Sequence, residues 1–288
     1  MSYLTNMAAL LSCDCGGRFF GQARRDDTMA VLCTPEELVR VNQIRAAVAV
    51  HWTAEDVDHV KLLLQTWKLA FPRCSVVSDD DLNSNDMERL NAVFQKVAWK
   101  DLGFQHTDPT TDIRGSRLLG VKHLASFSEQ YGEEMRSMLN AEHHLFPFAA
   151  CSFNVTYALI YHLRLNTKSE GVFISPYGGL EQPRFQITDG ARRSDYLGFL
   201  GLLPLLRGKH PESLLCILHA YALIAVVRQW KTAWKTAKKN SGMTPDEYFL
   251  MNFNREILPA AWQHVETLLI QRPHTLAELD FNHRQVFS

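Results

Sequence analysis

Two long stretches of the chain, residues 148–165 and 213–234, are apolar on almost every side of a helix. An ordinary surface helix keeps a polar face, so a helix without one has to be covered on all sides by other elements. Elsewhere apolar residues recur at helical spacing, as at Val60, Leu64 and Trp67, and alternating strand patterns hardly appear. The sequence therefore predicts an all-α fold, a compact orthogonal multi-helix domain with these two helices at its centre.

Helix-capping residues indicate where the helices begin. Residues 34–37 (Thr-Pro-Glu-Glu) combine a capping threonine, a proline at the first helical position and a glutamate at the third, which predicts a helix to about Val50. Residues 244–247 (Thr-Pro-Asp-Glu) repeat this signature before a helix that is expected to bend near Pro259.

Two further helix starts are predicted on either side of a polar, acidic loop at 73–84. Thr53 with Asp56 is expected to open the helix before this loop, and Asn85 with Glu88 the helix after it. Short side chains with an oxygen acceptor are favoured at such positions because they bind the first free N–H groups of a helix.

The predicted organisation is one helical domain with additions. Residues 1–56 are expected to form an N-terminal extension with one or more helices, 57–272 the domain, and 273–288 a polar, loose C-terminal tail. Residues 166–211 are rich in glycine, proline and mixed charge, and they are predicted to be a long inserted loop with a short helix at 195–206.

Composition excludes several classes of function. With 288 residues, 46% of them apolar, and a net charge of −1, the chain can bury a large core and gives no reason to expect nucleic acid as a partner. Its 6 cysteines are scattered, which is typical of free thiols in a reducing compartment. The sequence shows no signal peptide, and the apolar window Leu214–Val227 is shorter than the roughly 20 residues of a membrane span. A cytoplasmic protein without a transmembrane segment is therefore expected.

Motifs for autonomous catalysis are missing. There is no Walker A loop, no GxSxG sequence and no ligand spacing for a metal, and adjacent helical residues such as His143 and His144 point about 100° apart. No cofactor and no metal are predicted. A basic stripe at 228–239, or an acyl chain on Cys13 or Cys15, leaves peripheral membrane contact open, although a solvated helix end is the favoured explanation of the stripe.

The segment 99–120, WKDLGFQHTDPTTDIRGSRLLG, is the best candidate for a functional loop. An aromatic corner is followed by a polar turn at 108–112, and Arg114-Gly115 comes just before an apolar helix. Two interpretations follow from the residues: Arg114 pairs with Asp112 or Asp108 to hold the turn, or it is presented to a partner. Pro109 and Gly115 favour a shaped loop, because proline fixes the turn and glycine leaves space beside the arginine.

This segment resembles the ELMO domain family, in particular its short ELMOD type. The resemblance covers most of 57–272 but not the insertion at 166–211, and its core motif consists of Trp99, Gly103-Phe104-Gln105, Asp108-Pro109, Thr111-Asp112, Arg114-Gly115 and Leu119-Gly120. Two departures are present: Ile113 stands where phenylalanine is usual, and Ser116-Arg117 replaces a pair that commonly ends in glycine. Whether the second departure abolishes activity is left open.

The resemblance implies a GTPase-activating protein for an Arf-family, especially Arf-like, small GTPase. Arg114 matches the arginine taken as catalytic in the family, which would enter the partner in trans, while GTP and Mg²⁺ would belong to the partner. Residues expected to contact the partner are Trp99, Gln105, Asp108, Asp112 and Arg117. No reaction by the chain on its own is expected.

A non-catalytic scaffold that binds a small GTPase or its exchange factor is the alternative. The longer engulfment-type ELMO proteins use the same fold to assist a Rac exchange factor, and they carry helical repeats, a pleckstrin-homology domain and a proline-rich tail. The short flanks of this domain and its Asp112-x-Arg114-Gly115 sequence favour the activating protein. An ELMO domain redirected to binding alone by the insertion or by the altered Ser116-Arg117 pair is a third reading.

Overall fold

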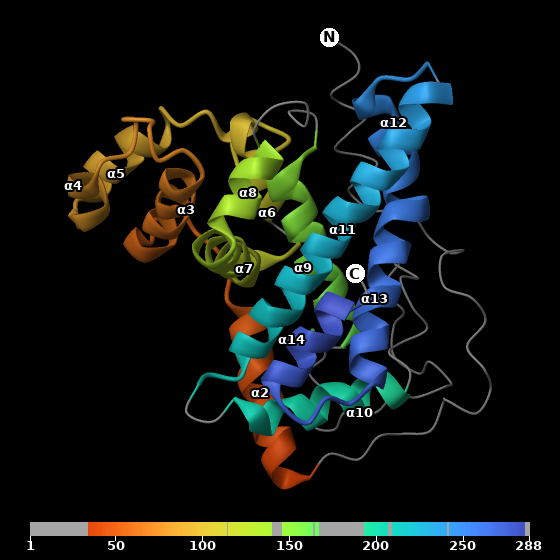
Figure 1. Ribbon diagram of the computed structural model, residues 1–288. Coiled ribbons are helices and arrows are strands. Elements are labelled where there is room, and N and C mark those ends of the chain that lie inside the picture. The colour runs from red at the N-terminus through yellow and green to blue at the C-terminus, as the bar shows by residue number, and fades with distance from the viewer. Residues whose placement is uncertain are drawn as a thin grey trace. The chain divides into compact units, whose positions relative to one another are not determined.

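Helices make up all the regular structure that can be described (Figure 1). The computed structural model describes residues 34–285 apart from 114, 140–145, 164, 167–192, 207–208 and 241. No strand occurs among these residues, which confirms the predicted all-α class. The chain divides into two units: one contains Val48–Tyr157, and the other contains the residues up to Ala47 and from Ala158 onward.

The Val48–Tyr157 unit is built around α3, which packs against α7, α8 and α5. Its core is apolar, and Leu63, Leu64 and Leu124 are fully buried in it. The elements are α3 (Val57–Ala70), α4 (Asp79–Asn83), α5 (Met87–Phe94), a 3₁₀ turn (Trp99–Leu102), α6 (Thr110–Ile113), α7 (Arg117–Gln130), α8 (Gly132–Leu139) and the first part of α9 (Phe148–His162).

In the other unit α11 packs against α13 and α12, and α10 packs against α13. Gly198 makes the last contact possible, because a Cβ at this position would lie 1.8 Å from the carbonyl oxygen of Leu269. The elements are α2 (Pro35–Ala49), α10 (Arg193–Leu202) with a 3₁₀ turn (Leu203–Leu205), α11 (Glu212–Asn240), α12 (Pro245–Asn252), a π-helical turn (Phe253–Ile257), α13 (Leu258–Ile270) and α14 (Leu276–Gln285).

Helix α11 is long and apolar enough to cross a membrane by length and composition, and 72% of its most apolar window is buried inside the structure. This burial agrees with the prediction of a core helix. The short helix predicted at 195–206 is confirmed by α10 and its 3₁₀ turn, and Phe199 and Leu203 are fully buried there. Residues 167–192 of the expected insertion lie outside the described residues.

The helix starts are partly as predicted. The Thr34–Glu37 and Thr244–Glu247 capping boxes both form, with the glutamate carboxylate accepting the threonine N–H at 2.8 and 2.9 Å. The predicted caps Thr53 and Asn85 are wrong, since Asp56 and Asp86 bind the free N–H groups of α3 and α5.

Two segments are more regular than their polar sequences indicate. The loop expected at 73–84 contains α4, which Ser78 and Asp81 cap reciprocally. The tail expected to be loose forms α14, where Leu279 and His283 are buried against the rest of their unit.

Candidate functional site

The aromatic corner that precedes the candidate loop belongs to the core of its unit. The Trp99 side chain is 2% exposed, and its indole N–H donates to the Phe94 carbonyl at 3.1 Å. Gly103 has a φ of 88°, and a Cβ there would lie 2.2 Å from the backbone nitrogen of Phe148. This glycine therefore turns the chain where only a bare backbone fits. The Trp99 indole is enclosed by aromatic neighbours and supports the loop from below, and its contact with a partner stays a prediction.

The polar turn is held by two aspartates that were predicted to contact a partner. The Asp112 side chain is only 5% exposed, and it accepts a hydrogen bond of 2.7 Å from the backbone N–H of Gln105. Burial raises the pKa of Asp112, against the opposite effect of this hydrogen bond and of His106 beside it. Asp108 is exposed, and its carboxylate accepts the N–H of Thr110 at 2.9 Å. Both carboxylates therefore have a structural role in shaping the loop, and Gln105 contributes its backbone to it.

Arg114 itself lies outside the described residues, but its neighbours on both sides are fixed. Ile113 ends α6 and is 2% exposed, and Ser116 precedes α7 and is 1% exposed. The backbone N–H and the hydroxyl of Ser116 both donate to the Ile113 carbonyl, at 3.1 and 3.2 Å. Gly115 is exposed, and a Cβ there would lie 3.2 Å from the ring of Tyr157. The two-residue stretch Arg114-Gly115 thus connects two buried residues, Ile113 and Ser116.

Arg117 begins α7 with a backbone φ of 56°, in the left-handed region that favours glycine. This is the position where the family pattern commonly has glycine, so the departure noted in the sequence falls on a strained backbone. The half-exposed side chain donates from Nη1 to the Val48 carbonyl at 3.2 Å, and the next residue, Leu118, donates its N–H to Val50 at 3.2 Å. These bonds attach the segment before α3 to the start of α7.

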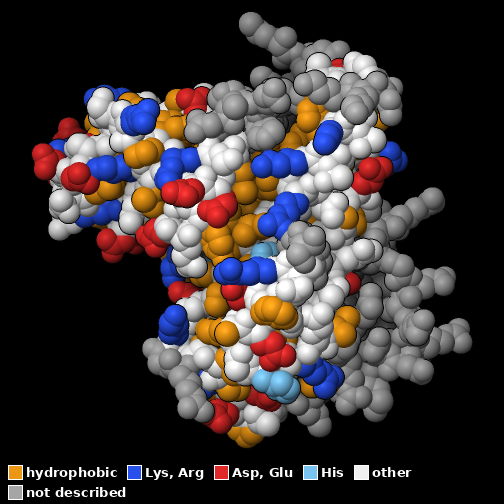
Figure 2. Space-filling view, viewed as in Figure 1, with side chains coloured by type: hydrophobic (Ala, Val, Ile, Leu, Met, Phe, Trp, Pro, Cys, Tyr) orange, Lys and Arg blue, Asp and Glu red, His pale blue; other side chains and the backbone are white. Residues whose placement is uncertain are grey.

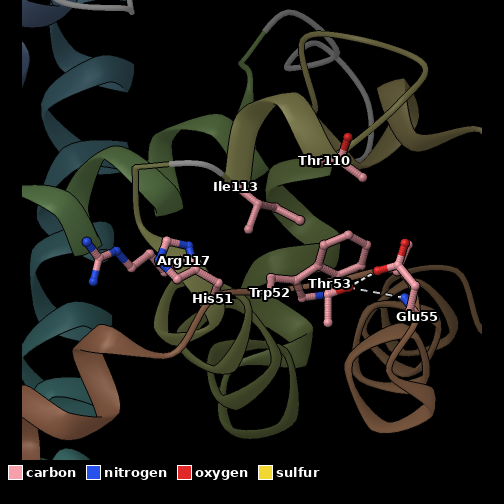
Figure 3. A pocket seen from close by; sticks show the side chains of 8 residues that line it. His51, Trp52, Thr53, Glu55, Thr110, Ile113 and Arg117 are labelled. Carbon is pink, nitrogen blue, oxygen red and sulfur yellow. Dashed lines mark hydrogen bonds between the residues drawn. The ribbon is translucent and has the colours of Figure 1, made fainter.

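A hollow of about 510 Å³ lies beside the candidate loop. Figure 3 shows its lining, with Trp52, Thr53 and Glu55 on the segment before α3 and Thr110 and Ile113 on α6. The Trp52 indole N–H donates to the His59 carbonyl at 3.2 Å, and the Thr53 N–H donates to the His59 ring at the same distance. Sequence reasoning missed this hollow, because residues 51–55 and 110–113 are far apart in the chain and only folding brings them together.

The basic stripe lies on an exposed face of α11. Figure 2 shows Lys and Arg side chains gathered along this helix, and Arg228, Lys231 and Lys235 are exposed. Trp230, in contrast, is 3% exposed and stacks on Trp234 with 6.0 Å between ring centroids. The side chains of Lys238 and Lys239 are not described.

Other candidate sites give little chemistry. Among the described residues no group of three or more His, Cys, Asp or Glu side chains could hold a metal ion. Cys74 and Cys151 are free thiols, and burial raises the pKa of Cys151 well above its usual value. Cys13, Cys15 and the His143-His144 pair lie outside the described residues.

Comparison with known proteins places the chain in a family. The model of the ELMO/CED-12 family matches residues 42–244. ELMO domain-containing protein 2 of Bos taurus is 32% identical over 108 residues, which are 36% of this chain and 32% of that protein. The Homo sapiens protein of the same name is 31% identical over 108 residues, again 36% of this chain and 32% of that protein. ELMO domain-containing protein B of Dictyostelium discoideum is 42% identical over 67 residues, 23% of each chain.

The matched segment thus spans about a third of the length of the first two relatives. No solved structure matches the chain. Because the family model covers residues 42–244 of 288, the chain belongs to the ELMO/CED-12 family.

Proposed function

We propose that this protein is a GTPase-activating protein for an Arf-family, especially Arf-like, small GTPase, and that it supplies Arg114 as an arginine finger. Membership of the ELMO/CED-12 family supports a role in small-GTPase regulation. The Asp112-x-Arg114-Gly115 sequence supports the more specific assignment.

The observation that carries the proposal is the anchoring of the residues around Arg114. Two hydrogen bonds from Ser116 to the Ile113 carbonyl join the residues that precede and follow the Arg114-Gly115 stretch. The nearby carboxylate of Asp112 is occupied by the Gln105 N–H and by Thr111 and His106, so the turn has its own supports. A catalytic group gains most when its attachment is already ordered before the partner arrives.

The chemistry explains why one arginine is sufficient. Hydrolysis of GTP spreads negative charge over the γ-phosphoryl oxygens in the transition state, and positioning and charge stabilisation do nearly all the catalytic work. A guanidinium stays charged and binds two oxygens at once, which suits it to this task better than an ammonium group. The partner would supply GTP, Mg²⁺ and the residue that orients the attacking water.

Single-turnover GTP hydrolysis by a panel of purified Arf and Arf-like GTPases, with and without the full chain, tests the proposal. We expect at least one member to be accelerated by about 10³-fold or more, the range of arginine fingers supplied in trans. If none is accelerated while one binds in its GTP state, the chain is a scaffold and the proposal is wrong.

A further inference from the structure

The hollow beside α6 has an apolar floor and an acidic rim. Its floor is formed by the half-exposed ring of Trp52 and by Ile113. Glu55 is exposed on the rim, and the hydroxyl of Thr53 is hydrogen-bonded to its carboxylate (Figure 3). Asp108, also exposed, holds the backbone of Thr110, another lining residue.

The basic side chains of the hollow lie at the end opposite Glu55. Arg117 lines that end, and Figure 3 shows its guanidinium pointing away from Trp52. One of its nitrogens is bound to the Val48 carbonyl. His51 is the other basic lining residue, while the lining between Trp52 and Glu55 contains no basic side chain. His59 is hydrogen-bonded to Trp52 and Thr53, and its ring lies 3.8 Å from the Asp56 carboxylate.

We infer that the Trp52–Glu55 end of this hollow binds a lysine or arginine side chain of the partner GTPase. The inference rests on the proposed function for the identity of the partner. A cation over the face of an indole is attracted by the ring, and tryptophan is the best of the aromatic side chains at this. The aliphatic stem of the same side chain would lie against Ile113 and the indole, and its charged head would meet the Glu55 carboxylate.

The position of the hollow gives the contact a purpose. Ile113 lines the hollow and directly precedes Arg114 in the chain. A basic side chain held there fixes the partner's surface within one residue of the proposed finger. The contact therefore contributes affinity, while Arg114 contributes the rate.

Charge reversal of Glu55 separates this role from catalysis. The binding partner in this test is the GTP-loaded Arf-family GTPase that the wild type stimulates. The variant Glu55→Lys is expected to bind it about tenfold more weakly at low salt, with a smaller loss of affinity at high salt. Hydrolysis at saturating protein is expected to stay at the wild-type rate. Asp58→Lys is the matched control: Asp58 is exposed in the first turn of α3 and does not line the hollow, so its reversal should leave affinity within about twofold.

A second arm does not depend on the GTPase. The Trp52 indole N–H signal, assigned by its loss in Trp52→Phe, is followed by NMR during titration with acetyl-Gly-Arg-Gly-amide. We expect a saturable shift in the wild type and in Asp58→Lys, no shift in Glu55→Lys, and none with acetyl-Gly-Glu-Gly-amide.

The outcomes separate the two ideas. If a GTPase is stimulated but Glu55→Lys binds it as tightly as the wild type does, the proposed function stands and the basic-side-chain site is wrong. If no GTPase is stimulated, the proposed function fails and the peptide titration decides the site alone. Equal shifts with the arginine and glutamate peptides, or an unchanged shift in Glu55→Lys, overturn the site.

Discussion

Arg117 has a backbone conformation that its side chain disfavours. It adopts a φ of 56° at the start of α7. An L-residue with a Cβ is destabilised in this left-handed conformation by about 1–2 kcal/mol, whereas glycine adopts it readily. The exchange of the usual family glycine for arginine thus costs conformational energy, which the hydrogen bond to Val48 offsets in part.

We predict that Arg117→Gly is more stable than Arg117→Ala by about 1 kcal/mol. Both variants lose the hydrogen bond to Val48, so the comparison isolates the backbone conformation. Inside an ordinary helix the order is the reverse, because alanine is favoured over glycine by a similar amount. Urea unfolding of the two variants measures the difference. Greater stability of the alanine variant would show that residue 117 is not left-handed in solution.

At the scale of the elements, Gly198 decides how closely α10 approaches α13. We predict that Gly198→Ala destabilises the protein by about 2 kcal/mol or more, because its Cβ would lie 1.8 Å from the Leu269 carbonyl oxygen and a packed backbone has to move. Gly201 is the matched control on the same helix, where a Cβ would meet nothing within 4 Å.

For Gly201→Ala we predict a gain of about 0.5–1 kcal/mol, as expected for an exposed helical glycine. Thermal unfolding of both variants measures the contrast. Similar effects at the two positions would argue against the tight contact of α10 with α13.

A pair of buried histidines joins α14 to α13. His264 and His283 are 5% and 6% exposed, and their ring nitrogens lie 2.8 Å apart. Burial lowers the pKa of His264 to about 4 and that of His283 to about 3, with Arg228 and the neighbouring histidine acting in the same direction on His283. Asp280 opposes this shift, and Arg284, which pairs with Asp280, reinforces it.

Both histidines are therefore neutral in the fold and charge more easily when unfolded, near pH 6.5. A lowered folded pKa gives stability that is complete above the unfolded pKa and is lost as pH falls through 6.5 towards about 4. We predict that His283→Gln, which removes one titrating group but keeps a hydrogen-bonding side chain, flattens the fall in unfolding free energy between pH 6.5 and 4. An equally steep fall in this variant would contradict the assignment.

The helices were largely predictable from the sequence, and the reasons are local. Apolar spacing predicted the core helices, and the capping boxes at 34–37 and 244–247 form as expected. The caps of α3 and α5 were misplaced by one to three residues, because several neighbouring side chains carry a suitable oxygen and only the backbone geometry selects one. Helix α14 was missed because its sequence is polar and its burial comes from tertiary contacts, such as that of His283 with His264.

The candidate site was less predictable than the fold. The sequence singled out the loop of Asp108, Asp112 and Arg114, but the burial of Trp99 and the hollow at Trp52 are results of tertiary packing. Residues of the same type can line a core or face a partner, and spacing along the chain does not distinguish the two.

At the scale of the whole molecule, residues 167–192 separate segments of the same unit. We predict that replacing them with a flexible Gly/Ser linker changes the unfolding free energy by no more than about 1 kcal/mol, because the entropy of closing a loop depends weakly on its length. This segment is rich in glycine and mixed charge, and few of its apolar residues recur at the spacing of a helix or strand face. Urea unfolding and circular dichroism measure the outcome, and insoluble protein or a collapsed transition would show that the segment is part of the core.

The proposed function of the whole molecule depends on one side chain, Arg114. The variants Arg114→Ala and Arg114→Lys are compared with the wild type in single-turnover hydrolysis by the stimulated GTPase. Arg73→Ala, the removal of an exposed arginine of the same unit, is the matched control, and thermal unfolding confirms that each variant is folded.

We predict that both Arg114 variants remain folded and lose about 10³-fold or more of the stimulated rate, because the forked contact exists chiefly in the transition state and lysine cannot replace it. Arg73→Ala should keep the wild-type rate. Stimulation by Arg114→Ala equal to that of the wild type, or a loss explained by unfolding, would contradict the assignment of Arg114 as the finger.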